Sequence, residues 1–165
     1  MLKKCFTSLV IVGLICSVAF AADELDWTKE QVGKLRHGLS EREVKQIIPG
    51  KPRRGPEQWW GADGEYRQEW KYPDGGITLG MVSKKKGGPK SIWSLTITSP
   101  STLQTEKGIR IGSTEQEVNE AYGRFRNAED SKKGEVFVAG SVFGGLIFTF
   151  QQGRVSKIFI GAAAE

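Results

Sequence analysis

The chain has 165 residues, of which 38% are hydrophobic, so it can bury a core without covalent cross-links. Its formal net charge of +5 is too small an excess to indicate nucleic acid as a partner, and we expect none. The two cysteines are Cys5 and Cys16, and both lie so near the start that the rest of the chain cannot form a disulfide.

The N-terminus has the pattern of a secretory signal peptide. Lys3 and Lys4 form a basic start, an apolar run follows over 5–20, and Ala19 and Ala21 are spaced as a cleavage site requires. We therefore predict that residues 1–21 are a signal peptide cleaved after Ala21. The mature protein is then expected in the periplasm or outside the cell.

Two alternatives to cleavage fit the sequence less well. An uncleaved anchor needs about 20 apolar residues, whereas this run is slightly short and contains three hydroxyl side chains. A lipoprotein would attach its lipid at Cys16, but the bulky Leu14 and Ile15 precede it. A cleaved signal fits these residues best, and it leaves no membrane span in the mature chain.

An internal similarity relates residues 38–48 to residues 112–122. Each segment begins at a glycine and continues with a capping box, in which a hydroxyl residue is followed three positions later by glutamate. Apolar residues at helical spacing come next. The boxes are Ser40 with Glu43 and Thr114 with Glu117. The sequence therefore predicts two short helices, one ending at Pro49–Gly50 and the other at Gly123.

Strand patterns follow each predicted helix. The clearest is 66–72, where side chains alternate so that Trp70 and Tyr72 lie on one face and charged residues on the other. The further strands are predicted at 77–81, 92–97, 135–139, 146–150 and 155–160. A further short helix starting at Thr28 is expected to bury Val32 and Leu35.

These elements predict an α+β fold of two tandem repeats. Each repeat would pack one or two short helices on a three- to four-stranded antiparallel sheet. The first repeat would occupy residues 22–99 and the second residues 100–165, with the boundary near Ser99–Ser101.

The first repeat resembles a fold shared by two kinds of protein, on the residues Gly38, Ser40, Val44, Gly50, Pro52, Trp70 and Tyr72. One is the small lipoprotein of the outer-membrane β-barrel assembly machine, and the other is the family of tandem-repeat β-lactamase inhibitory proteins. The resemblance implies a helix-turn-helix packed on a small antiparallel sheet. It also implies that the open sheet face and its loops bind the partner.

Catalytic groups are scarce in the sequence. His37 is the single histidine, so no second histidine is present to build a zinc site with it. Both cysteines lie in the predicted signal peptide, so the mature chain has no cysteine nucleophile. We therefore predict no enzyme activity, no metal and no cofactor, and interpret His37 as a solvated residue at the break between two predicted helices. A hydrolase that uses His37 is the remaining enzymatic alternative.

One segment has the composition of a binding surface, because adjacent tryptophans lie near arginines, as in interface hot spots. If Trp59 and Trp60 lie on a strand, they point to opposite faces. The charged face of the strand at 66–72 is the second candidate. The predicted partner-binding residues are Arg53, Arg54, Trp59, Trp60, Arg67, Glu69 and Lys71.

These patterns favour an exported, non-enzymatic interaction module of the bacterial cell envelope that binds a protein partner. The alternative is a periplasmic binder of a glycan or lipid ligand, held in a groove lined by tryptophan. The loop with Lys84, Lys85 and Lys86 is expected to be a soluble loop, with contact to anionic lipid as a minor alternative.

Overall fold

The computed structural model describes residues 24–164. The predicted signal peptide and its cleavage after Ala21 lie outside the described residues. Within 24–164, no helix is long and apolar enough to cross a membrane.

An eight-stranded antiparallel sheet forms most of the described chain, in the order β3-β5-β6-β7-β10-β9-β8, with β4 paired to β5 beside β3. Its strands are β3 (Arg53–Arg54), β4 (Gln58–Trp60), β5 (Glu65–Tyr72), β6 (Ile77–Ser83), β7 (Ser91–Thr98), β8 (Val136–Ser141), β9 (Gly144–Gln151) and β10 (Arg154–Gly161). The helices are α1 (Glu41–Ile47) and α2 (Glu115–Tyr122), with one-turn 3-10 helices η1 (Pro73–Gly75) and η2 (Gly123–Phe125). A separate hairpin consists of β1 (Gln31–Val32) and β2 (Leu35–Arg36).

The predicted α+β fold of two tandem helix-plus-sheet repeats is wrong. The protein is predominantly β, and its long strands belong to one sheet because β7 pairs with β10, with Ile97 opposite Ile158. Two small sheets would each leave an edge strand with unpaired backbone groups. Pairing β7 with β10 satisfies both edges and joins the apolar faces into one core.

Both predicted capping boxes are confirmed. The backbone N–H of Ser40 donates to the Glu43 carboxylate over 2.8 Å, and that of Thr114 donates to Glu117 over 2.6 Å. Each hydroxyl in turn accepts from the glutamate's N–H. The predicted ends are also correct, because α1 stops just before Pro49 and α2 stops at Tyr122.

The helix predicted from Thr28 is wrong, because this segment forms the hairpin of β1 and β2. Gly33 has φ +61 and occupies the first position of a two-residue turn, a conformation that glycine adopts at little cost. Val32 and Leu35 pair across the turn and are fully buried, so their predicted burial is confirmed.

The strand predictions between residues 66 and 160 are confirmed as β5 to β10. In β5 the alternation has the expected sense, because Trp70 and Tyr72 are buried while Glu69 and Lys71 are exposed. The boundary predicted near Ser99–Ser101 lies in the connection that follows β7.

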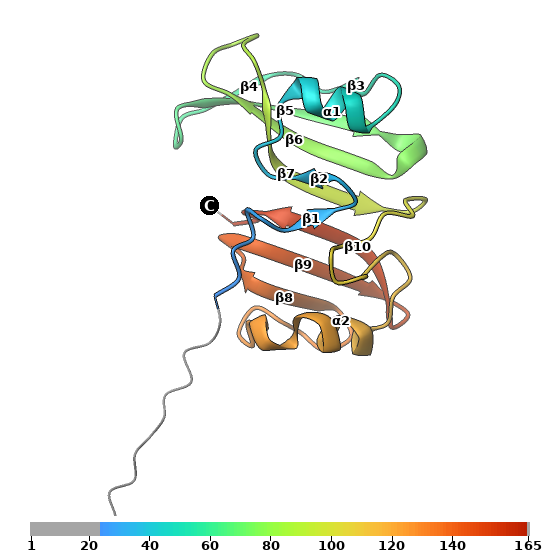
Figure 1. Ribbon diagram of the computed structural model, residues 1–165. Coiled ribbons are helices and arrows are strands. Elements are labelled where there is room, and N and C mark those ends of the chain that lie inside the picture. Colours follow the sequence, from blue (N-terminus) through green and yellow to red (C-terminus); the bar gives the residue numbers. More distant parts are fainter. Residues whose placement is uncertain (1–23, 165) are drawn as a thin grey trace, which may run out of the picture.

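The apolar core lies between one face of the sheet and the helices. Figure 1 shows α1 beside the upper strands, α2 beside the lower ones, and the β1–β2 hairpin between them. Val44 of α1 and Val118 and Tyr122 of α2 are fully buried there, and the Tyr122 ring packs 5.2 Å from that of Phe148. We call the opposite side of β5, β6, β7 and β10 the open face, since no helix of the described chain lies on it.

Candidate functional site

An arginine held between two tryptophans is the main feature of the open face. The Cζ atom of Arg67 lies 4.6 Å from the ring centroid of Trp60 and 4.2 Å from that of Trp93. Its guanidinium also forms an ion pair with Asp63, and its side chain is only 16% exposed. Each cation–π contact is worth about 0.5–2 kcal/mol, more where water is excluded.

The hairpin of β4 and β5 places Trp60 against this arginine. Gln58 lies opposite Arg67 and Trp60 lies opposite Glu65. Because residue pairs opposite one another project to the same side of a sheet, Trp60 faces the side that Arg67 occupies.

Gly80 of β6 makes room for the second tryptophan. A Cβ atom built on Gly80 would lie 2.5 Å from Nε1 of Trp93, so the indole lies across the backbone of the neighbouring strand. The pairing of β6 with β7 shifts register between Gly80 and Met81. A bulge of this kind redirects side chains locally.

These side chains line a cavity of about 530 Å³, which we call the open-face groove. Its aromatic and charged members are Trp60, Arg67, Glu69, Trp93 and Phe159. Gln58, Ser94 and Thr96 add hydrogen-bonding groups. Aromatic walls with a few polar groups are the usual composition of a recognition site.

Five of the seven predicted binding residues project to the open face. Trp60 and Arg67 are in contact, and Glu69 and Lys71 follow Arg67 along the same side of β5 with an ion pair of 2.8 Å between them. Arg53 lies opposite Lys71 and completes the set.

Trp59 and Arg54 project to the other side. The Trp59 ring packs 4.9 Å from that of Tyr66, so the two adjacent tryptophans point to opposite faces as predicted. Arg54 places its Cζ atom 4.1 Å from the Trp70 ring centroid and binds Glu41 of α1 over 3.2 Å. Arg54 therefore helps to pack α1 on the sheet rather than lining the groove.

A largely buried ion pair ties the residue before β4 to the loop between β6 and β7. Lys90 Nζ lies 2.8 Å from a Glu57 oxygen, and the Gly87 N–H donates to the other oxygen over 2.8 Å. The contact with Lys90, followed by that with Gly87, lowers the pKa of the Glu57 carboxyl. Lys84 of the same loop binds Glu65 over 2.6 Å, so this basic loop is fixed to the sheet edge.

Sequence reasoning missed two residues of the groove, Trp93 and Phe159. Trp93 follows the buried Ile92, and the alternation of that strand could have indicated an outward aromatic. Phe159 lies between two buried isoleucines. Because these three consecutive residues are all apolar, the sequence does not indicate which face of the sheet Phe159 occupies. Its position opposite Thr96 depends on the pairing of β10 with β7.

His37 has an aromatic neighbour instead of open solvent. Its ring lies 4.9 Å from the Trp27 ring in an edge-on arrangement. Burial, and secondarily the charge of Arg36, lower the pKa of the imidazole. The neutral ring is favoured in this setting.

Comparisons with protein-family models, curated proteins and solved structures found no match for this chain. The resemblance to the β-lactamase inhibitory proteins and the assembly lipoprotein therefore gains no support from them. Function has to be argued from the open-face groove itself.

Proposed function

We propose that the protein is an exported, non-enzymatic interaction module that binds a protein partner through the open-face groove. The observation that carries this proposal is Arg67 held between Trp60 and Trp93. Tryptophan and arginine dominate the binding energy of protein interfaces when they cluster at a protected centre. The two indoles hold the guanidinium in place, which lowers the entropy cost of binding.

The charges around the groove favour a partner with acidic groups at its rim. Arg53 and Lys71 lie on the open face of β3 and β5, and Lys157 of β10 lies opposite Thr98. Glu69 forms an ion pair with Lys71, and Asp63 forms one with Arg67, so part of the positive charge is neutralised. Rim charges of this kind affect the rate and specificity of association more than its strength.

Export is part of the proposal and rests on the sequence pattern of residues 1–21. It is tested by separating the envelope and cytoplasmic fractions and sequencing the N-terminus of the mature protein. A mature chain starting at Ala22 in the envelope or medium supports it. A chain that keeps Met1 in the cytoplasm contradicts it.

The binding surface is tested by affinity capture from envelope extract. We expect the wild-type protein to enrich one partner, and the double variant Trp60→Ala/Trp93→Ala to lose at least about tenfold of it, a typical cost for two central aromatic residues. Trp59→Ala is the matched control, because Trp59 neighbours Trp60 but projects to the other side.

The control also decides the outcome. A partner lost equally in Trp59→Ala and in Trp60→Ala/Trp93→Ala would place binding elsewhere on the sheet edge. Failure of the wild-type protein to enrich any partner over the double variant would remove the protein-binding proposal.

A glycan or lipid ligand is the second candidate, because the groove combines two indole walls with Gln58, Glu69 and Thr96. Flat apolar rings with a few hydrogen-bonding groups suit small ligands as well as proteins. Titration with cell-wall fragments and with lipid extract, read by tryptophan fluorescence, tests this candidate. A saturable change lost in Trp93→Ala supports it, and a flat titration rejects it.

A further inference from the structure

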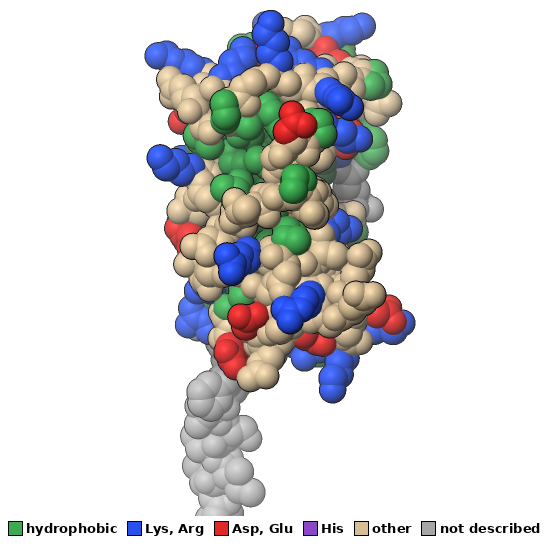
Figure 2. All heavy atoms as spheres, turned by 90° about the vertical axis from the view of Figure 1, so that its right-hand side faces the viewer, with side chains coloured by type: hydrophobic (Ala, Val, Ile, Leu, Met, Phe, Trp, Pro, Cys, Tyr) green, Lys and Arg blue, Asp and Glu red, His purple; other side chains and the backbone are tan. Residues whose placement is uncertain are grey.

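Two adjoining hollows form a polar cleft where β7 ends and β9 turns into β10. One occupies about 980 Å³ and the other about 340 Å³. Ile111, Gly112 and Arg154 line both hollows, and we call the two together the basic cleft. Figure 2 looks onto this end of the molecule: hydrophobic side chains gather in its upper half, and in its lower half basic side chains stand among polar ones. The basic cleft shares no lining residue with the open-face groove.

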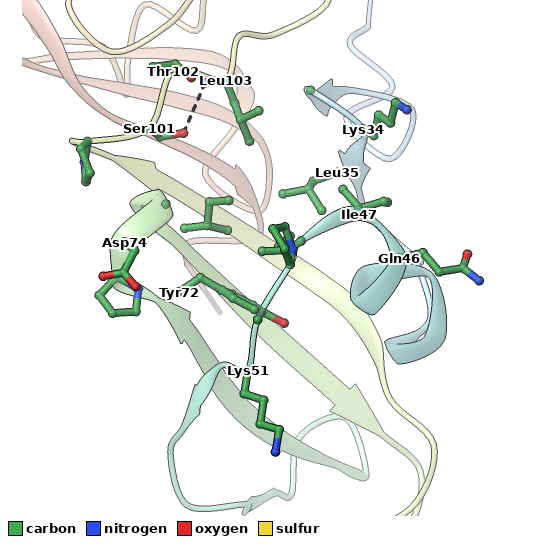
Figure 3. A pocket seen from close by; sticks show the side chains of 18 residues that line it. Lys34, Leu35, Gln46, Ile47, Lys51, Tyr72, Asp74, Ser101, Thr102 and Leu103 are labelled. Carbon is green, nitrogen blue, oxygen red and sulfur yellow. Dashed lines mark hydrogen bonds between the residues drawn. The ribbon is translucent and has the colours of Figure 1, made fainter.

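The segment 100–103 separates the basic cleft from a hydrophobic hollow beside it. Ser101 and Thr102 line both, whereas Leu103 lines only the hydrophobic hollow. The Leu103 N–H donates to the Ser101 hydroxyl over 3.3 Å, the bond that is dashed in the close view of that hollow in Figure 3. The Ser101 N–H in turn donates to the Thr98 carbonyl over 2.9 Å. This wall of the cleft is therefore held in place before a ligand arrives, which lowers the entropy cost of binding.

Three basic side chains lie along the cleft, Arg110, Arg154 and Lys157. All three are exposed, and none forms an ion pair with a carboxylate of residues 24–164. The fold orients Arg154, because its guanidinium donates to the Gly112 carbonyl over 2.9 Å. Guanidinium groups bind the oxygens of carboxylates and phosphates through paired hydrogen bonds. The cleft therefore presents cations that suit an anionic ligand.

Glu117 is the single carboxylate among the described residues that line the cleft, and Thr114 already occupies it. The Thr114 N–H donates to this carboxylate over 2.6 Å and the Thr114 hydroxyl over 3.0 Å. These two bonds lower the pKa of the Glu117 carboxyl, and the charges of Arg154 and Arg110 lower it further. Both arginines therefore lie near one point of the cleft, and one carboxylate leaves an excess of positive charge there.

The rest of the lining favours a ligand with hydroxyl groups. Hydroxyl and amide side chains line the larger hollow: Thr98, Ser99, Thr149, Gln151, Gln152 and Ser156. Among the described residues around the two hollows none is aromatic, and only Ile111 and Val155 are aliphatic, so the cleft has no wall for a nucleobase or an acyl chain. Gln152 has φ +52, where a tight turn between strands usually has glycine or asparagine. The turn itself therefore does not explain a long amide side chain at this position.

We propose that the basic cleft binds an acidic oligosaccharide, with its carboxylates at Arg110, Arg154 and Lys157 and its hydroxyls at the amide and hydroxyl side chains. Such a glycan carries charge and hydrogen-bonding groups without an aromatic ring or a long apolar chain, which matches the lining of the cleft. The exposed cations act mainly through charge, and their contribution weakens as the salt concentration rises. The site is separate from the open-face groove, so the two proposals stand or fall independently.

Isothermal titration calorimetry of the mature protein with trigalacturonate, maltotriose and triglutamate tests this proposal. Trigalacturonate carries both carboxylates and hydroxyls, maltotriose only hydroxyls, and triglutamate only carboxylates. We expect saturable binding of trigalacturonate at one site, at least about tenfold tighter than that of either other probe, as loss of several contacts implies. No detectable binding of trigalacturonate overturns the proposal, as does equal affinity for maltotriose. Triglutamate binding as tightly as trigalacturonate would make an acidic peptide the occupant and overturns it as well.

Charge reversal locates the site. Arg110→Glu/Lys157→Glu is expected to lower the affinity for trigalacturonate by about tenfold, while circular dichroism stays as in the wild type because both side chains are exposed. Lys85→Glu/Lys86→Glu changes the net charge equally on the loop between β6 and β7 and is the control. Affinity that falls equally in both double variants, or in neither, overturns the assignment.

A variant of the open-face groove separates the two sites. Trp60→Ala/Trp93→Ala is expected to bind trigalacturonate as tightly as the wild type, because neither tryptophan lines the basic cleft. Loss of trigalacturonate binding in this variant, with binding retained in Arg110→Glu/Lys157→Glu, would place the glycan in the open-face groove and overturn the assignment to the cleft.

Discussion

Glu30 is a carboxylate that the fold buries. Its residue is 9% exposed, and its carboxylate accepts a hydrogen bond of 3.1 Å from the hydroxyl of Tyr122. Burial raises the pKa of Glu30, although the Tyr122 hydrogen bond and the charge of Lys107 act in the other direction. Glu106 nearby raises it further. The bond joins the segment before β1 to α2.

The pH dependence follows from the direction of this shift. A carboxyl whose pKa is higher in the folded state binds its proton more readily there than in the unfolded chain. Glu30 therefore favours the folded state of the protein at low pH. The contribution of Glu30 to stability falls as the pH rises from 4.5, the ordinary value, through the raised folded value.

Glu30→Gln is expected to remove this pH dependence. The amide oxygen still accepts from the Tyr122 hydroxyl, while no charge is buried at neutral pH. The variant should be more stable than wild type at pH 7 and close to it at pH 4. Urea unfolding midpoints at the two pH values measure the difference. Glu43→Gln is the contrasting control, because its pKa is lowered by the Ser40 hydroxyl and backbone N–H, so its loss should destabilise at pH 7.

The strands β6 and β7 show how an element positions a functional side chain. Gly80 leaves the space that the Trp93 indole occupies, and its φ is not in the left-handed region, so alanine is compatible with the backbone. A methyl group at this position would crowd the Ser94 hydroxyl and Nε1 of Trp93, so both side chains have to move. Overpacking of this kind costs about 1–3 kcal/mol.

Gly80→Ala is therefore expected to shift the tryptophan emission and to weaken binding of the groove's partner. The same change in a Trp93→Phe background should leave the emission nearly unaltered, because the displaced indole is gone. Fluorescence spectra and urea midpoints of the four proteins form a double-mutant cycle. A full emission shift in the Trp93→Phe background would assign the effect to another tryptophan.

The sequence predicts elements well where the signal is local. The hydroxyl and glutamate of each capping box interact within one turn, so α1 and α2 were predictable from four consecutive residues. The segment from Thr28 carries a similar local pattern, yet Gly33 and the pairing of Val32 with Leu35 form a hairpin instead. At this segment the turn, together with the burial of both apolar side chains, outweighs a weak preference for helix.

At the scale of the whole molecule, the arrangement depends on contacts that no local pattern contains. The pairing of β7 with β10 brings Phe159 opposite Thr96, and so adds an aromatic ring to a groove whose other members lie before residue 97. Trp60 and Arg67 were predictable as neighbours because one hairpin carries them. Trp93 and Phe159 required the order of the strands.

One continuous sheet predicts one cooperative unfolding transition. The core residues Leu95 and Ile97 of β7 lie opposite Ile160 and Ile158 of β10, so neither half of the sheet can unfold without exposing the buried edge of the other. Tryptophan fluorescence reports on this coupling, because four of the five tryptophans lie between residues 59 and 93, far along the chain from β9.

Phe148→Ala in β9 is therefore expected to destabilise the region that the tryptophans report on. Phe148 is fully buried, and its truncation should cost about 3–5 kcal/mol. The urea midpoint should fall by the same amount in tryptophan fluorescence and in far-ultraviolet circular dichroism. Thr149→Ala, a half-buried neighbour on the other side of β9, should shift both by less than about 0.5 kcal/mol. A fluorescence midpoint that stays at its wild-type value while circular dichroism loses a separate phase would show that the two halves unfold independently, despite the pairing of β7 with β10.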